Sequence, residues 1–506
     1  MPVVFRPGQL VYEGHPYALA VADCAVSKAC AYCLKRSDLS IPGGVTLQRC
    51  SGCHYLHFCS RECQVADWAD HKAECANLKR VAPRRPLEPA RLMARLVLRW
   101  KRELEDPTCE TLLGNRRRLK DCMDHRERIK MDRDRAKGFI WLLSLLKQFL
   151  SGPQLERVAD IDILNLFGIM CINTMHVADD DGPLGCGLYL AASMIDHSCN
   201  PNVSGSFRGR ILQLMPLREF EASSVADLSL SYITLHTTRE RRRAELNKCY
   251  YFMCECEMCS GAIPEVMTEA DSKLTDRVFE LRDLTLDMSS EENPKRALCA
   301  LKELFAGELA NLEDNDVAKF TAQLTAADAS VATADYALAR DYYLSLLPVL
   351  KKVYSENHPQ YAHKLVRLCR LMIVTTKQSR DVEEVSRLLM LLRTAVHIAR
   401  QALGENHFDT KDVTALYLEM EASLRKGANS HSSSSASVQP RFANNDGGDA
   451  DSTVLAGAAL GREQQETSSG IVTTSAGSEV ISLAVAKPIE DIPPYENIPE
   501  AECINE

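Results

Sequence analysis

The chain has 506 residues, of which 45% are hydrophobic and 25% are charged, and its formal net charge is −9 at pH 7. This length exceeds what one hydrophobic core supports and predicts about three domains. No apolar run approaches the ~20 residues of a membrane-spanning helix, and the first residues lack a signal-peptide pattern. We therefore expect neither a membrane protein nor a secreted one.

The chain contains 20 cysteines, many of them at spacings typical of metal ligands. Because the cytosol and nucleus keep thiols reduced, zinc explains these cysteines better than disulfides, and we expect a cytoplasmic and nuclear protein. Residues 1–260 carry a formal charge of +5 and residues 261–506 one of −14. Thiolate–zinc sites would cancel the positive excess, and the arginine runs at 116–118 and 239–243 are typical of solvated helix faces. The sequence therefore does not support direct nucleic-acid binding.

The chain opens with two predicted short strands, at residues 3–5 and 9–12, separated by a turn at Pro7-Gly8. Residues 30–75 give the clearest signal in the sequence, because they hold eight cysteine and histidine ligands, enough for two tetrahedral zinc sites. These ligands are Cys30, Cys33, Cys50, Cys53, Cys59, Cys63, His71 and Cys75. A segment this small needs bound metal for its stability.

The region up to residue 185 reads as mainly helical, and strand-like alternation follows it. Hydrophobic periodicity predicts helices, and the three glycines between 182 and 187 indicate a turn. The predicted helices span 87–104, 132–150 and 154–174, and the predicted strands span 210–215 and 228–232.

The segment 193–202 combines an acid, an imidazole, a thiol and an Asn-Pro-Asn turn. Cys199 has no neighbouring cysteine, but three more follow about fifty residues later, at Cys254, Cys256 and Cys259. We expect these four thiolates to form a third zinc site that joins the two segments.

The rest of the chain is helical and then polar. The stretch at 354–359 recurs 49 residues later, at 403–408, which indicates repeated helical hairpins between 262 and 426. Residues 427–506 are rich in Ser, Gly and Ala, and we expect them to be disordered.

The cysteine spacing, together with the stretches 55–60 and 68–75, resembles the MYND zinc finger. That resemblance implies two interleaved sites: Cys30, Cys33, Cys59 and Cys63 would hold one zinc, and Cys50, Cys53, His71 and Cys75 the other. It also implies that the finger binds proline-rich peptides of partner proteins.

The order of motifs over residues 1–425 resembles the SET and MYND domain protein methyltransferases. The similar motifs are Arg6–Leu10, Asp196–Asn202, Ser231-Tyr232 and Cys254–Cys259. The implied fold is α+β, with a SET-type β core, an inserted finger and a tetratricopeptide-like helical domain. The implied divisions are first strands at 1–29, finger at 30–75, helical insert at 76–185, SET core at 186–234, post-SET zinc cluster at 235–261, helical repeats at 262–426 and tail at 427–506.

The resemblance implies transfer of a methyl group from S-adenosylmethionine to a lysine of a histone or another protein, with three zinc ions bound. Tyr232 would orient the lysine nitrogen, and Tyr189 and Tyr250 would line the substrate channel. The implied cofactor contacts are Asn173, Ser193, Ile195, Asp196, His197 and Phe252. We expect a monomer.

Three departures from the family pattern leave a second function open. With the chain beginning at Met1-Pro2-Val3, we expect no Gly-x-Gly cofactor loop ahead of the first strand. Asp196 stands where the family has asparagine, and Arg126 and Arg128 stand where it has an acid and an amide. Loss of buried polar partners weakens binding. The alternative to an enzyme is therefore a catalytically impaired, zinc-binding scaffold.

Overall fold

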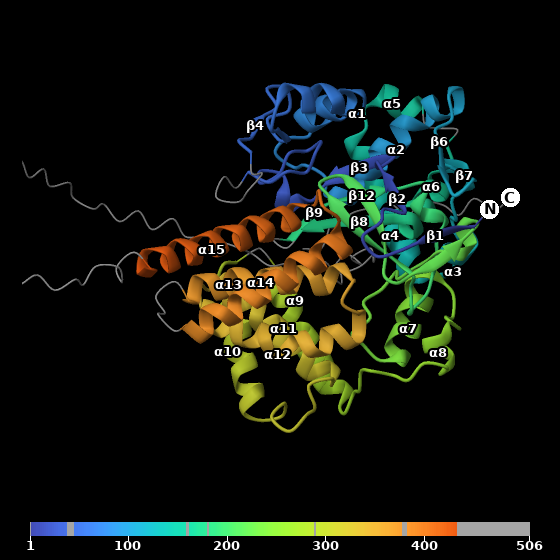
Figure 1. Ribbon diagram of the computed structural model, residues 1–506. Helices are drawn as coiled ribbons and strands as arrows, with labels where there is room; N and C mark the ends of the chain where they lie inside the picture. Colours follow the sequence, from blue (N-terminus) through green and yellow to red (C-terminus); the bar gives the residue numbers. More distant parts are fainter. Residues whose placement is uncertain are drawn as a thin grey trace, which may run out of the picture.

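A computed structural model describes residues 2–37, 45–157, 161–179, 182–287, 290–376 and 382–432. A β-rich lobe is formed by the N-terminal half, and a bundle of helices from the C-terminal half lies against it (Figure 1). Within the described residues, no helix is both long and apolar enough to cross a membrane.

The β-rich lobe is built from several small sheets. Two three-stranded sheets have the orders β3-β9-β8 and β11-β12-β2, and two-stranded pairs form between β1 and β13 and between β10 and β14. The strands are β1 (Val3–Phe5), β2 (Tyr12–Gly14), β3 (Ala18–Val21), β8 (Thr174–Asp179), β9 (Gly182–Leu188), β10 (Asp196–His197), β11 (Val203–Arg208), β12 (Ile211–Pro216), β13 (Phe220–Ala222) and β14 (Ser229–Leu230).

The prediction of a glycine turn at 182–187 is wrong, because these residues form β9, the middle strand of its sheet. The glycines serve close packing instead. A Cβ atom on Gly185 would lie 2.5 Å from the carbonyl oxygen of Ala20 on β3. Because the neighbouring backbone approaches so closely, there is no room for a side chain, and only glycine fits at this position.

Two other predicted elements differ from the structure. The second strand begins at Tyr12 rather than residue 9, and β1 pairs with β13, far along the chain. The predicted helix 154–174 is divided into α5 (Gly152–Arg157) and α6 (Ile163–Asn173). The Asp162 carboxylate starts α6 afresh by accepting a 2.9 Å hydrogen bond from the amide of Asn165.

The finger and the helical insert lie between β3 and β8 in sequence. The helices expected near 87–104 and 132–150 are confirmed, whereas the hairpin β6–β7 was not predicted. The elements are β4 (Gln48–Arg49), β5 (His57–Phe58), α1 (Arg61–Arg80), α2 (Glu88–Glu105), β6 (Cys109–Leu112), β7 (Asn115–Arg118), α3 (Arg126–Met131) and α4 (Arg133–Phe149).

The C-terminal half is helical, as predicted, and its last helix extends six residues into the segment expected to be disordered. The remainder of that segment, 433–506, lies outside the described residues. The helices are α7 (Arg239–Tyr250), α8 (Glu257–Ser260), α9 (Ser272–Leu286), α10 (Asn293–Ala306), α11 (Val317–Ala332), α12 (Tyr336–Tyr354), α13 (Pro359–Thr376), α14 (Val382–Leu403) and α15 (Phe408–Ser432).

The repeated Glu-Asn-His stretch has one structural role in both copies. Each copy forms the turn between two helices, and its histidine caps the second helix of the pair. The Nδ1 atom of His358 accepts from the amide of Gln360 at 3.1 Å, and that of His407 from the amide of Asp409 at 3.2 Å. The echo in the sequence therefore marks equivalent turns of a repeating helical array.

The two lobes share a core and several polar contacts. Cys199, Ile233 and Tyr250 pack in the same buried cluster as side chains of α11 to α14. The amide of Gly8 donates to the carbonyl of Gln401 at 3.1 Å. The segment around Tyr250 is thus positioned by the helical lobe as well as by the sheets.

Candidate metal centres and active site

Two interleaved ligand clusters form in the finger. One consists of Cys30, Cys33, Cys59 and Cys63 and the other of Cys50, Cys53, His71 and Cys75, and in each cluster all ligand atoms lie within 4.8 Å of one another. Zinc–sulfur bonds of about 2.3 Å imply sulfur–sulfur separations of roughly 3.8 Å in a tetrahedron. The observed separations are 3.6 Å for Cys33–Cys59 and 3.8 Å for Cys50–Cys75. Both predicted ligand sets are therefore confirmed, and their chemistry fits zinc.

A buried charge network supports the histidine ligand. Nε2 of His71 faces the Cys50 sulfur at 3.4 Å, while Nδ1 lies 3.5 Å from the Glu74 carboxylate. Arg95 on α2 binds that carboxylate at 2.5 Å and also pairs with Asp67. A carboxylate behind a ligating imidazole fixes its orientation and raises its basicity. The network also attaches the finger to the helix beneath it.

The third cluster confirms the prediction that Cys199 joins a distant cysteine trio. Its ligands are Cys199, Cys254, Cys256 and Cys259, with all four sulfur atoms within 4.8 Å of one another. The sulfur atoms of Cys199 and Cys259 are 3.6 Å apart, as a tetrahedral zinc site requires. The turn after β10 and the segment after α7 are therefore held together at one point.

Beside this cluster, Tyr232 is held by two hydrogen bonds, one from its amide and one from its hydroxyl, and by contacts with two aromatic rings. β10 and β14 run parallel, and Nδ1 of His197 accepts a 3.0 Å hydrogen bond from the amide of Tyr232. The Tyr232 hydroxyl donates to the carbonyl of Ile195 at 2.5 Å. Its ring centroid lies 5.3 Å from His197 and 5.0 Å from Tyr250, and Phe252 lies 5.9 Å from His197. The structure thus gathers five of the predicted site residues.

Burial sets the protonation states in this group. It raises the pKa of the Tyr232 phenol well above its ordinary value, with a further contribution from Asp196. It lowers the pKa of His197 to about 4. At neutral pH the tyrosine is therefore a neutral hydroxyl, and the histidine is a neutral ring that accepts through Nδ1.

Asn173 and Ser193 meet a neighbouring segment rather than the aromatic group. The Asn173 carboxamide donates to the carbonyls of Met123 and Ile169 at 2.7 and 2.9 Å. The Ser193 hydroxyl donates to the Leu190 carbonyl and lies 3.8 Å from the Cys122 sulfur. Because Met123 adjoins Cys122, residues 122–123 connect the two side chains.

Two other predicted positions have different surroundings. Tyr189 is fully buried, donates to the carbonyl of Arg210 at 2.8 Å and belongs to the core of the sheets, not to the cluster around Tyr250. Arg126 pairs with Asp162 and with Asp124, a carboxylate that the sequence interpretation missed. Asp124 also accepts from Asn165 at 2.5 Å. The sequence signal that could have identified Asp124 is the presence of an acidic residue two positions before Arg126.

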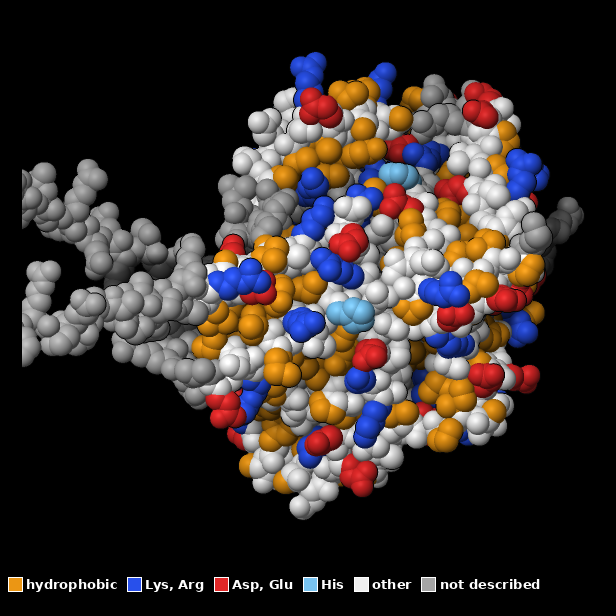
Figure 2. Space-filling model, viewed as in Figure 1, with side chains coloured by type: hydrophobic (Ala, Val, Ile, Leu, Met, Phe, Trp, Pro, Cys, Tyr) orange, Lys and Arg blue, Asp and Glu red, His pale blue; other side chains and the backbone are white. Residues whose placement is uncertain are grey.

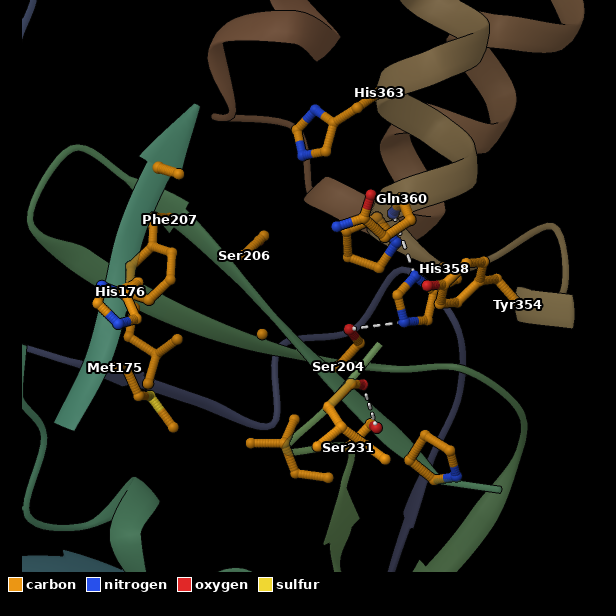
Figure 3. Close-up of a pocket in the computed structure, with 17 residues that line it drawn as sticks. Met175, His176, Ser204, Ser206, Phe207, Ser231, Tyr354, His358, Gln360 and His363 are labelled. Atoms are coloured by element: carbon orange, nitrogen blue, oxygen red, sulfur yellow. Dashed lines mark hydrogen bonds between the residues drawn. The ribbon is translucent and has the colours of Figure 1, made fainter. Parts of the chain in front are cut away.

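A cavity lies between the sheets and the start of α13 (Figure 3), and the Tyr232 side chain is not part of its lining. Ser231 and Ile233, which flank Tyr232, are part of its wall, and among the described residues no acidic side chain lines it. In Figure 3, His358 points from the turn before α13 toward Ser204 on β11, and Nε2 and Oγ lie 3.3 Å apart. The sequence interpretation missed these residues, although His358 belongs to the repeated turn it singled out. The wall includes Met175, His176, Ser204, Phe207, Tyr354, His358, Gln360 and His363.

Comparison with known proteins agrees with these features. The MYND finger family model matches residues 30–75. Histone-lysine N-methyltransferase SMYD3 of Mus musculus is 24% identical over 430 residues, which cover 83% of this chain and 94% of that protein.

Two further relatives cover less of the chain. Histone-lysine N-methyltransferase SMYD1 of Homo sapiens is 27% identical over 330 residues, covering 62% of this chain and 60% of that protein. SET domain-containing protein 14 of Caenorhabditis elegans is 32% identical over 253 residues, covering 48% and 53%. The finger match, the three ligand clusters and the similarity along most of the chain agree: the chain contains a MYND finger and is similar to the SET and MYND domain-containing methyltransferases.

Proposed function

We propose that the protein is an S-adenosylmethionine-dependent protein-lysine N-methyltransferase that acts on a histone or another protein. The observation that carries the proposal is the Tyr232 hydroxyl, which donates to the Ile195 carbonyl while its ring lies against those of His197 and Tyr250. A buried hydroxyl and a carbonyl at one point can together orient an amine.

Asn173, Ser193, Ile195, Asp196, His197 and Phe252 would hold the cofactor. Both hydrogen bonds described for the Asn173 carboxamide use its nitrogen, so its oxygen is available as an acceptor. Phe252 offers an aromatic face next to His197. This mixture of amide, carbonyl and aromatic groups fits an adenosine with an amino-acid tail. When bound, S-adenosylmethionine supplies an electrophilic methyl group on a sulfonium.

The residues around Tyr232 would prepare the lysine. Their aromatic surfaces exclude water, which lowers the pKa of a buried amine and favours its nucleophilic, neutral form. The Ile195 carbonyl can accept one N–H of this amine, and the Tyr232 oxygen can accept another. Because Tyr232 stays protonated, it positions the amine rather than removing its proton. The aromatic rings also tolerate the cationic product.

The test is isothermal titration of the full chain with S-adenosylmethionine, followed by transfer of labelled methyl to lysine-containing proteins. We expect binding in the micromolar range and label on lysine. Absence of both heat and transfer at high micromolar cofactor would reject the enzymatic function.

That negative result would support the second candidate, a zinc-binding scaffold. The observation that favours it is Asp196, which is exposed and places a carboxylate where the family has an amide. The three ligand clusters would preserve the shape of the molecule in either case.

We further propose that the finger binds proline-rich peptides of partner proteins. Val65 and Trp68 lie one turn apart on α1 and are 64% and 43% exposed, so they present an apolar strip at the finger surface. Aromatic side chains suit proline-rich ligands in their extended conformation.

Replacing Trp68 with alanine is expected to weaken binding of a proline-rich peptide by about tenfold, which corresponds to roughly 1.4 kcal/mol. Fluorescence anisotropy with a labelled peptide measures this change. As a matched control, Leu104→Ala removes another exposed apolar side chain, on α2, and should leave affinity unchanged. Equal affinity of the Trp68 variant and the wild type would locate the peptide elsewhere.

The remaining expectations concern partners and location. Arg241 pairs with Glu269 and Asp276, and Arg242 with Glu265, so acids compensate part of one arginine run. Basic and acidic side chains are interspersed over the face shown in Figure 2. We therefore propose protein substrates rather than nucleic acid, and a monomer acting in cytoplasm and nucleus. In a gel-shift assay we expect no shift of labelled DNA at either low or high salt. A measurement of molecular mass in solution should give the mass of a monomer.

A further inference from the structure

A fourth group of metal-ligand side chains lies away from the finger and from Cys199. It consists of Glu88, His176 and Cys186, whose ligand atoms all lie within 4.8 Å of one another. This group is independent of the proposed methyl transfer.

Strand register brings two of these side chains together. His176 on β8 is directly opposite Cys186 on β9. Residues that face each other across an antiparallel pair project from the same side of the sheet, with Cβ atoms about 5 Å apart. The imidazole and the thiol are therefore neighbours on one sheet face.

Helix α2 supplies the third side chain. It packs on β3 and β9, and the Arg91 guanidinium attaches it to β3 by donating to the carbonyl of Val21 at 2.5 Å. This contact brings the first helical residue, Glu88, over the His176–Cys186 pair. Cys186 is only 4% exposed, and Glu88 and His176 are partly buried.

The Glu88 carboxylate lacks the compensation that a buried acid needs. Burial raises its pKa to about 7, despite the nearby Arg91. Of the hydrogen bonds among described residues that involve Glu88, the one outside its own helix uses its backbone amide, which donates to Asp23 at 2.9 Å. A buried carboxylate without such partners is destabilising unless a cation neutralises it.

We propose that Glu88, His176 and Cys186 bind a divalent cation of borderline softness, most suitably Zn²⁺. Carboxylate oxygen, imidazole nitrogen and thiolate sulfur are all zinc ligands, and the combination suits zinc better than magnesium or calcium. One carboxylate and one thiolate neutralise the two charges of the ion, so the loaded site is electrically neutral. Three protein ligands leave a fourth coordination position for water, unlike the closed four-ligand clusters.

The site has a structural consequence for the cavity. His176 also lines the wall of that cavity and lies on β8, the outer strand of its sheet (Figure 3). A metal ion on His176 would fix this strand to β9 and α2. The metal ion would then also hold the part of the cavity wall to which His176 contributes.

The test counts zinc in the purified full chain by elemental analysis after equilibration with micromolar Zn²⁺. We expect four equivalents in the wild type, because this site adds one to the three four-ligand clusters. Glu88→Gln preserves shape and should reduce the count to three, as should Cys186→Ser. Cys171→Ser removes a buried thiol that belongs to no cluster and should retain four.

A chelator titration separates this site from loss of a finger zinc. A three-ligand site should release its ion first, so one equivalent should leave the wild type before the other three, and Glu88→Gln should lack this early phase. Three equivalents in the wild type, or an unchanged count and release profile in Glu88→Gln, would overturn the proposal. Thermal unfolding of Glu88→Gln close to that of wild type from which only the first zinc equivalent has been removed shows that the variant is folded.

Discussion

Replacing Tyr232 with phenylalanine is expected to reduce methyl transfer by about 100-fold or more while the protein stays folded. This substitution removes only the phenolic hydroxyl, which is the group that donates to the Ile195 carbonyl at 2.5 Å. The ring should keep its place, because His197 and Tyr250 contact it and the His197 ring still accepts from the main-chain amide. Loss of one buried hydrogen bond costs about 1 kcal/mol of unfolding free energy.

Transfer of labelled methyl groups and thermal unfolding measure these two effects. The control is Tyr251→Phe, which removes a hydroxyl three residues before Cys254. In the wild type this hydroxyl donates to Asp132 at 3.0 Å. That variant should keep its activity within about twofold, since its hydroxyl faces away from the proposed lysine position. Equal activity of Tyr232→Phe and wild type would assign Tyr232 a structural role only.

Replacing Cys199 with serine is expected to remove one zinc equivalent and to lower the unfolding temperature by at least about 10 °C. Cys199 is the single ligand that its segment contributes, and the other three ligands come from a separate segment. A structural zinc contributes about 10 kcal/mol or more to the folding of small domains, so even partial loss is large here. Methyl transfer should fall as well, because His197 is two residues away and contacts the same sulfur.

Zinc analysis and calorimetry check this result in the full chain. Cys249→Ser is the matched control: its thiol is buried five residues before Cys254 and belongs to no ligand cluster. It should keep its zinc content. A Cys199→Ser protein with unchanged zinc and unchanged stability would show that the third cluster does not bind metal.

Local spacing explains which features were predictable. The finger ligands lie within 46 residues, and their number and spacing indicated two tetrahedral zinc sites, while the resemblance to the MYND finger implied which four ligands each site takes. The repeated Glu-Asn-His stretch was recognisable because each copy makes the same short-range cap, from histidine to the amide two residues on. Helices with strong apolar periodicity, such as α2 and α4, were predicted for the same reason.

Features that depend on distant packing were not predictable. The three glycines of β9 suggest a turn by local propensity, but β3 approaches Gly185 so closely that any other residue would clash. Tyr189 looked like a channel residue by its position in the motif order, yet its hydroxyl is directed to Arg210 within the core of the sheets. Such outcomes depend on which strands pair, and tertiary packing overrides local preference.

By itself the sequence indicated three groups of zinc ligands and the helical repeats, because these follow from ligand chemistry or short-range periodicity, and its resemblance to a known family implied the α+β class. Only the tertiary structure decided that Tyr232 faces Ile195 across the parallel pair β10–β14, and that Glu88 lies over His176 and Cys186. These side chains come from segments far apart in the chain. Strand register and helix packing bring them together, and neither leaves a local mark in the sequence.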